Sequence, residues 1–145
     1  MSTLSIRDNI RYIFTIKGSP RSIAAAFALG VFIGLSPFIG LHTLLALVLS
    51  SLLGLNRMVT LSGAYLTNPW TIVPIYTFCT WFGIKITGYE QSMPDIDFHS
   101  INILNLFRAL KSLLWPFFVG TTLVGVVCAL ISYLIVYRLL LRIKG

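Results

Sequence analysis

The sequence predicts an all-α integral membrane protein, and its composition and the placement of its charges both lead to this prediction. Hydrophobic residues make up 57 % of the chain, charged residues make up 10 %, and the mean hydropathy is +0.88. This composition excludes an ordinary soluble domain. Charged side chains are absent from residues 22–55, 58–84 and 116–137. Because a helix needs ~20 apolar residues to cross the ~30 Å hydrocarbon core, these stretches are typical of helices buried in a bilayer.

The 145 residues fit a single transmembrane domain over residues 22–137. An amphipathic N-terminal helix is predicted within residues 1–21, because four apolar side chains recur there at helical spacing: Ile6, Ile10, Ile13 and Phe14. We interpret it as an interfacial helix with a basic face toward anionic lipid. The alternative is a soluble helix packed on a partner. Residues 138–145 are predicted to form a basic cytoplasmic tail.

Residues 22–55 form an uncharged stretch of 34 residues, broken at Ser36-Pro37-Phe38-Ile39-Gly40. This stretch is too long for one comfortable crossing and too short for two crossings and a turn. Arg21 and Arg57 bracket it, as expected if the chain enters the membrane and returns to the side it left. The pattern therefore predicts a broken, re-entrant helical hairpin.

Small residues recur every four positions in both arms of this hairpin. The first arm carries Ala26, Gly30 and Gly34, and the second carries Ala46, Ser50 and Gly54. Small side chains let helix backbones approach closely, which favours association in lipid. We expect these six residues to pack helix against helix, with the two rows facing each other across the hairpin.

Residues 58–88 form a Pro-interrupted segment. Asn68 is a good N-cap and Pro69 suits the first position of a helix, so a helix is predicted to begin at Pro69. The 20 residues from Pro69 to Gly88 are enough for a crossing, with a kink near Pro74. A second re-entrant hairpin is the competing interpretation.

The C-terminal part predicts a loop, an interfacial helix and a transmembrane helix. Residues 89–102 are polar, and residues 103–114 have an amphipathic pattern that favours the membrane interface. Trp115-Pro116 predicts a kink or a restart, and residues 116–137 form the clearest span. With this topology, eight basic residues lie on the side of both termini and three on the other side. The excess predicts cytoplasmic N- and C-termini.

The two interruptions are the positions best suited to a ligand. A helix that begins at Ser36-Pro37 or at Asn68-Pro69 would present free N–H groups and the positive end of its dipole at membrane depth, which favours an anion such as phosphate. The predicted ligand-binding residues are Ser36, Pro37, Gly40, His42, Thr43, Asn56, Arg57, Asn68 and Pro69. Arg21 and Arg57 are expected at the cytoplasmic mouth of the hairpin, where they could hold the same anion. In the alternative interpretation, these residues only turn the chain, cap helices and anchor them at the headgroups.

His42 is the only titratable side chain within the first apolar stretch. A proton relay is one interpretation, and a neutral imidazole bonded to a nearby carbonyl is the favoured one. No cofactor or metal site is predicted: His99 and Asp97 give only two ligands in a loop, and Cys79 and Cys128 lie 49 positions apart. No pattern of nucleophile, base or paired carboxylates indicates an enzyme.

Several landmarks together carry a resemblance to a known family. They are the run Gly30-Val31-Phe32-Ile33-Gly34-Leu35-Ser36-Pro37-Phe38-Ile39-Gly40-Leu41-His42-Thr43, then Leu55-Asn56-Arg57, then Thr67-Asn68-Pro69-Trp70-Thr71 with Pro74 and Tyr76. In their order and spacing, residues 18–137 closely resemble the bacterial membrane family catalogued as domain of unknown function 2062. The resemblance implies an inner-membrane location, and some relatives join the domain to enzymes of cell-envelope sugar chemistry. Many relatives carry Gln at the position of His42, which argues against an essential imidazole.

The leading functional hypothesis is a small inner-membrane protein that transports or handles a phosphorylated membrane lipid, or another anion, at its discontinuous helices. A chain with two spans and one hairpin hardly encloses a pathway, so a homo-oligomer is expected. The alternative is a membrane scaffold or accessory subunit that docks a cell-envelope enzyme such as a glycosyltransferase. Nucleic acid is not an expected partner, because the basic residues lie at the margins of apolar segments.

Overall fold

The computed structural model describes residues 18–38, 40–88, 99 and 102–144, and all regular secondary structure in these residues is helical. The helices are α2 (Pro20–Leu35), α3 (His42–Leu52), α4 (Arg57–Ala64), α5 (Pro69–Thr87) and α6 (Ile103–Lys144). The predicted all-α class is confirmed for this part of the chain. The amphipathic helix predicted within residues 1–21 and the loop at 89–102 lie largely outside the described residues.

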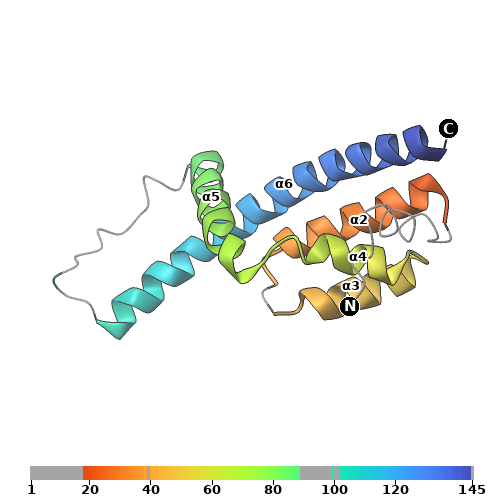
Figure 1. Ribbon diagram of the computed structural model, residues 1–145. Coiled ribbons are helices and arrows are strands. Elements are labelled where there is room, and N and C mark those ends of the chain that lie inside the picture. The colour runs from red at the N-terminus through yellow and green to blue at the C-terminus, as the bar shows by residue number, and fades with distance from the viewer. Residues whose placement is uncertain (1–17, 39, 89–98, 100–101, 145) are drawn as a thin grey trace, which may run out of the picture.

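The first three described helices lie side by side and alternate in direction, as Figure 1 shows. α2 and α3 form the two arms of the predicted hairpin, and α4 then runs parallel to α2. Gly40 and Gly54, in the turns before and after α3, have φ angles of 84° and 65°. Glycine is favoured in this left-handed region because it has no Cβ. These two glycines therefore explain why the chain reverses direction at both ends of α3.

The small residues of α2 pack against α4, which differs from the expected pairing of the two rows. A Cβ atom on Gly30 would lie 2.9 Å from the backbone nitrogen of Ala64, and one on Gly34 would lie 2.8 Å from its carbonyl oxygen. Ala46 of α3 is fully buried and joins a cluster with Ile33 and Ala64. Ser50 is also buried, but Gly54 is a turn residue with open space around it. The prediction that Gly54 packs helix against helix is therefore wrong, because Gly54 lies in the turn after α3.

α5 begins at Pro69, as predicted, with Asn68 as its N-cap. The side chain of Thr71 accepts a hydrogen bond from the backbone N–H of Asn68 at 2.8 Å, so a donor at the helix start is satisfied. The helix continues through Pro74 and ends at Gly88, whose φ of 66° forms a left-handed C-cap. α5 crosses α6 near the middle of the molecule (Figure 1).

α6 runs from Ile103 to Lys144, so the helix predicted over residues 116–137 is longer at both ends. Of the predicted kink or restart at Trp115-Pro116, the restart is wrong, because the chain stays helical through Pro116. Pro116 is fully buried, and Gly83 of α5 packs against its carbonyl group. α6 therefore packs closely against α5 at the point where the proline removes one hydrogen bond from the helix.

Among the described helices, α6 alone has both the length and the hydropathy of a membrane span. The candidate segment is Lys111–Ile143, with a mean hydropathy of 2.3 over 18 residues. α5 has 19 residues, but its proline, threonine, tyrosine and tryptophan side chains lower its hydropathy. α2 and α3 are shorter apolar helices.

Candidate functional site

Polar side chains from three elements meet the backbone where α2 ends. The carbonyl oxygen of Ser36 accepts a hydrogen bond from the hydroxyl of Tyr76 at 2.9 Å. Nε2 of His42 lies 3.3 Å from the same oxygen, so the ring nitrogen that faces the carbonyl is the one that carries the proton. The hydroxyl of Ser36 donates to the carbonyl oxygen of Ile33 at 2.6 Å. These bonds satisfy carbonyl groups that the end of a helix leaves free.

Thr67 joins the ends of α2 and α4. Its hydroxyl lies 3.0 Å from the carbonyl oxygen of Gly34 and 3.1 Å from that of Ala64. Nearby, the hydroxyls of Thr43 and Tyr65 lie 3.2 Å apart. We call this group the polar junction, and it comprises Ser36, His42, Thr43, Tyr65, Thr67, Asn68 and Tyr76. It brings together both interruptions that the sequence singles out.

The junction corrects the predicted role of Ser36. Ser36 is the C-cap of α2, where a helix ends, and the next helix begins six residues later at His42. The free groups at Ser36 are therefore carbonyl oxygens, and they attract hydrogen-bond donors and not anions. Free N–H groups lie instead in the first turn of α3, where the N-cap Leu41 makes no side-chain hydrogen bond.

Asn56 and Arg57 lie at the opposite end of α4 from the junction. The side-chain oxygen of Asn56 accepts hydrogen bonds from the backbone N–H groups of Met58 at 3.0 Å and Val59 at 3.3 Å. Asn56 is therefore the N-cap of α4, and the exposed Arg57 is its first residue. The eight residues of α4 put about 12 Å between this end and the junction. The predicted ligand-binding residues therefore fall into two groups, one at or near the junction and the other, Asn56 and Arg57, at the far end of α4.

Arg21 lies at the same end of the helical body as Arg57, since α2 and α4 are parallel (Figure 1). A side-chain hydrogen bond with Tyr137 of α6 raises the pKa of the Arg21 guanidinium above its ordinary value. The pair connects the first turn of α2 to the last part of α6. Arg21 is therefore a fixed positive charge at the edge of the apolar segment and lies far from the junction.

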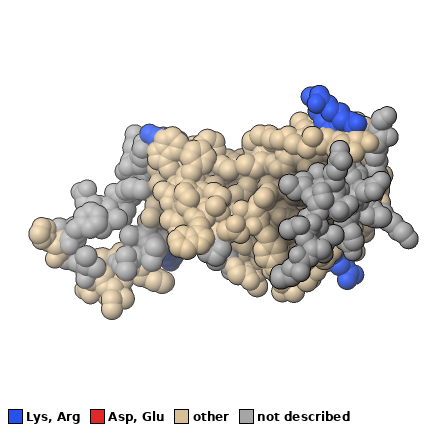
Figure 2. Space-filling model, in the orientation of Figure 1, with Lys and Arg blue, Asp and Glu red and all other residues tan. Residues whose placement is uncertain are grey.

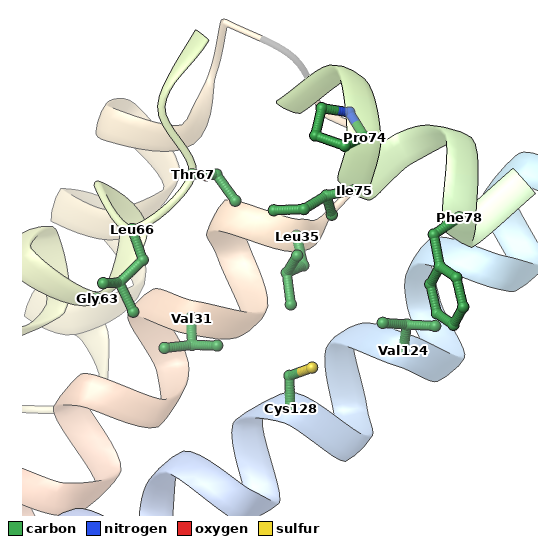
Figure 3. A pocket seen from close by; sticks show the side chains of 10 residues that line it. All are labelled: Val31, Leu35, Gly63, Leu66, Thr67, Pro74, Ile75, Phe78, Val124 and Cys128. Carbon is green, nitrogen blue, oxygen red and sulfur yellow. The ribbon is translucent and has the colours of Figure 1, made fainter. Parts of the chain in front are cut away.

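An apolar groove of about 490 Å³ adjoins the polar junction. Figure 3 shows that the groove lies between α2, the end of α4 with the connection that follows it, α5 and α6. The lining residues are Val31, Leu35, Gly63, Leu66, Thr67, Pro74, Ile75, Phe78, Val124 and Cys128. Thr67 belongs both to this groove and to the junction, so one polar side chain of the junction lines the otherwise apolar groove.

A second cavity of about 440 Å³ extends the groove between α5 and α6. It shares Phe78, Val124 and Cys128 with the first cavity and adds Phe82 and Ile86 of α5. The two cavities therefore adjoin each other along the crossing of α5 and α6. We call both together the groove.

The groove meets the middle of the uncharged part of α6, and the junction meets its first part. The groove is lined by Val124 and Cys128, whereas the ring of Tyr76 packs edge-on against Phe117 at 5.0 Å. The uncharged run of α6 covers residues 112–137, so Phe117 is its sixth residue. The junction therefore contacts α6 closer to Lys111 than to Arg138.

Sequence reasoning had not assigned several of these residues to a site. Tyr76 and Thr67 belong to the landmarks of the family resemblance, and their hydroxyl groups within an apolar segment were the available signal. The groove residues Val31, Val124 and Cys128 gave no signal, because an apolar residue that lines a cavity has the same pattern as one that packs. No group of three or more His, Cys, Asp or Glu side chains that could hold a metal ion occurs in the described part of the chain.

Comparison with known proteins gives one match. The model of a family described as "Uncharacterized protein conserved in bacteria (DUF2062)" matches residues 5–144. No curated protein and no solved structure matches the chain.

Proposed function

The chain belongs to the bacterial DUF2062 family, and from this premise we propose that it is a multi-pass protein of the inner membrane that binds and handles a phosphorylated membrane lipid. Its N- and C-termini face the cytoplasm in this proposal, and it acts without a catalytic step of its own. The observation that carries the proposal is the pair of adjoining apolar cavities, the first of which is lined by Thr67 of the polar junction.

The surface supports a position within a bilayer. Figure 2 shows lysine and arginine side chains toward the two ends of the visible face, and the described residues visible between them carry no charge. Along α6, Lys111 and Arg138 enclose 26 uncharged residues, which is about 39 Å of helix. A bilayer with its headgroups is ~40–45 Å thick, so both charges would reach the headgroup regions.

Three hydroxyl groups between the two charged ends of the molecule form hydrogen bonds within their own helices. Ser62 donates to the carbonyl oxygen of Met58, Thr77 to that of Val73 and Thr122 to that of Phe118, each at 2.7 or 2.8 Å. Such bonds remove the cost of an exposed hydroxyl in hydrocarbon. They favour a lipid-exposed position for these helices.

Helix lengths favour a re-entrant arrangement of α2 and α3. α2 has 16 residues and α3 has 11, so they measure about 24 Å and 16 Å. Each is shorter than the ~30 Å core, and the turn between them would lie within it. In this arrangement α5 crosses the membrane and α6 returns, which puts the larger number of basic residues on the cytoplasmic side.

The groove supports a lipid as the ligand, because its lining side chains are almost entirely apolar. Hydrocarbon in such a groove is separated from water and leaves no polar group without a partner. The phosphorylated headgroup would bind near the first turn of α3, where the N-cap Leu41 leaves the backbone N–H groups without a side-chain cap, and beside the capped start of α5. His42 and Asn68 are the predicted polar contacts there.

The test uses native mass spectrometry of gently extracted protein and compares two tryptophan substitutions on α6. Val124 lines both cavities, whereas Val126 is 44 % exposed and lines neither. Val124→Trp fills the groove and should abolish the co-purifying phosphorylated lipid, while Val126→Trp should retain it. Equal lipid occupancy in the wild type, Val124→Trp and Val126→Trp would contradict the proposal, provided that the variants unfold at similar temperatures.

The scaffold alternative requires a surface that can receive a partner helix. The row of small residues on α2 is such a surface, but α4 of the same chain packs against it. Gly30→Leu would therefore disrupt the protein itself and would not report on a partner. A stoichiometric complex between the lipid-free protein and a membrane enzyme would favour the scaffold.

A further inference from the structure

α5 forms one wall of the groove, and it is held differently from the helices on the other side. α2 packs against both α4 and α6, whereas α5 packs extensively against α6 alone among the described helices. At the crossing of α5 and α6, Gly83 and Gly120 bring the two backbones into direct contact. The first turns of α5 lie outside this contact, and Trp70 and Val73 there are 91 % and 69 % exposed. α5 is therefore fixed mainly at the crossing.

A buried hydrogen bond connects α5 to the end of α2. The hydroxyl of Tyr76 donates to the carbonyl oxygen of Ser36 at 2.9 Å, and both residues are buried. Nε2 of His42 lies 3.3 Å from the same oxygen. Because a carbonyl oxygen can accept two hydrogen bonds, His42 would still satisfy it if Tyr76 withdrew. Breaking the connection therefore leaves one polar group, the hydroxyl of Tyr76, without its partner.

The Tyr76–Ser36 hydrogen bond lies beside the groove. Ile75 of α5 and Leu35 of α2 both line the groove, as Figure 3 shows. Each of these two residues directly precedes a partner of the hydrogen bond. The separation of the α5 side from the α2 side of the groove is therefore set where Tyr76 meets Ser36.

We propose that α5 is a movable wall of the groove and that the Tyr76–Ser36 hydrogen bond is the latch that fixes its position. When this bond breaks, α5 turns about the contact between Gly83 and Gly120, and its first turns move away from α2. Interlocking side chains fix the angle at which two helices cross. The two glycines place no side chains at the pivot, so a small rotation drives none into the opposite helix. The groove becomes wider while α2, α3 and α4 keep their packing.

The two native cysteines report on this movement in the purified protein. Cys128 lines the groove, whereas Cys79 is fully buried and its carbonyl group packs against Gly120 at the pivot. N-ethylmaleimide labels accessible thiols in detergent solution, and peptide mass spectrometry measures the labelling rate of each cysteine. Tyr76→Phe removes the hydroxyl and keeps the ring that packs on Phe117. The loss of one hydrogen bond should accelerate labelling of Cys128 by about 2- to 10-fold and leave Cys79 protected.

Tyr65→Phe is the matched control, because it removes a tyrosine hydroxyl that is paired with Thr43 of α3. Its labelling rate at Cys128 should equal that of the wild type. An unchanged rate at Cys128 in Tyr76→Phe would overturn the latch. Equal acceleration at Cys79 and Cys128 would overturn the pivot, because it would indicate a general loosening of the helices.

Double electron–electron resonance between spin labels measures the same movement as a distance. Val73→Cys on α5 and Leu44→Cys on α3 carry exposed labels in a background without the native cysteines. The reference pair, Leu44→Cys and Leu139→Cys, joins α3 to α6. Tyr76→Phe should lengthen or broaden the first distance and leave the reference distance unchanged. Identical distributions with and without Tyr76→Phe would contradict a movable wall.

The inference concerns the same groove as the proposed function, but neither measurement requires a bound lipid. A wall that moves in a protein that never retains a phosphorylated lipid would support this inference and contradict the proposed function. An immobile wall in a protein that retains the lipid would do the reverse.

Discussion

Gly83 of α5 and Gly120 of α6 lie directly against each other's helices at the crossing point. A Cβ atom on Gly83 would lie 3.1 Å from the backbone nitrogen of Gly120, and one on Gly120 would lie 3.1 Å from the nitrogen of Gly83. The Cβ atom on Gly83 would also overlap the carbonyl group of Pro116, and the Cβ atom on Gly120 would overlap that of Cys79. Two backbones are therefore in contact here, and no side chain can move aside to make room.

Gly120→Ala should destabilise the protein by about 1–3 kcal/mol or more, because the overlap is with backbone atoms. In a helix without such contacts, the same change stabilises by roughly 0.5–1 kcal/mol. Thermal unfolding in detergent, followed by the loss of helical circular dichroism, measures the difference. Gly83→Ala should have a similar effect, because it enters the same contact from the other side.

Gly125→Ala is the matched control for this prediction. Its Cβ would lie 3.3 Å from the ring of Phe32, which is a side chain that can shift by a few tenths of an ångström. The unfolding temperature of Gly125→Ala should therefore stay close to that of the wild type. A fall as large as that of Gly120→Ala would show that the crossing is not the tight contact described.

Thr67→Val should lower stability because it removes the hydroxyl between α2 and α4. The carbonyl oxygens of Gly34 and Ala64 would lose this donor in a partly buried position. We expect a loss of about 0.5–1.5 kcal/mol, whereas Thr67→Ser should retain most of the stability. Thr77→Val serves as the control, because Thr77 is exposed and bonds only within α5. The measurement is thermal unfolding, and equal effects of Thr67→Val and Thr77→Val would contradict the assigned role.

Local signals for turns and helix starts could be predicted from the sequence, whereas the helix that covers the small face of α2 could not. The start of α5 at Pro69 and the turn before His42 were predictable, because Asn-Pro and Ser-Pro with a following glycine act through local backbone geometry. The small face of α2 was also visible from its spacing. The helix that packs against this face, α4, could not be predicted, because spacing defines a face of a helix and does not define the element that covers it.

The same limit applies to the candidate site. Ser36 was predicted to start a helix, but it ends α2, because Ser-Pro occurs at both ends of helices and the two cases share a local sequence. α6 stays helical through Pro116, whose carbonyl group packs against Gly83, 33 positions earlier in the chain. Tyr76 reaches Ser36 across 40 positions. Tertiary contacts of this kind have no periodic signal in a single sequence.

Asn56 and Arg57 should respond differently to substitution, although both were predicted to bind a ligand. Asn56→Ala removes the cap of two N–H groups of α4 and should cost about 1 kcal/mol, and Asn56→Asp should restore most of it. Arg57→Ala changes an exposed side chain and should leave the unfolding temperature nearly unchanged. If Arg57→Ala instead reduced both stability and lipid retention, the basic end of α4 would belong to the binding site.

The proposed orientation predicts which ends of the molecule a membrane-impermeant maleimide can reach. Gly18 and Asn105 are exposed and lie at opposite ends of the uncharged region, one before α2 and one in the first turns of α6. Because eight of eleven basic residues lie on the side of the termini, Gly18→Cys should be protected in intact spheroplasts and Asn105→Cys should be labelled. Neither substitution alters the charge balance that sets the orientation.

Permeabilisation should expose Gly18→Cys, and the wild type should stay unlabelled because Cys79 is buried and Cys128 lines the groove. The opposite pattern would place both termini outside, and labelling of both variants in intact spheroplasts would exclude the crossing between them.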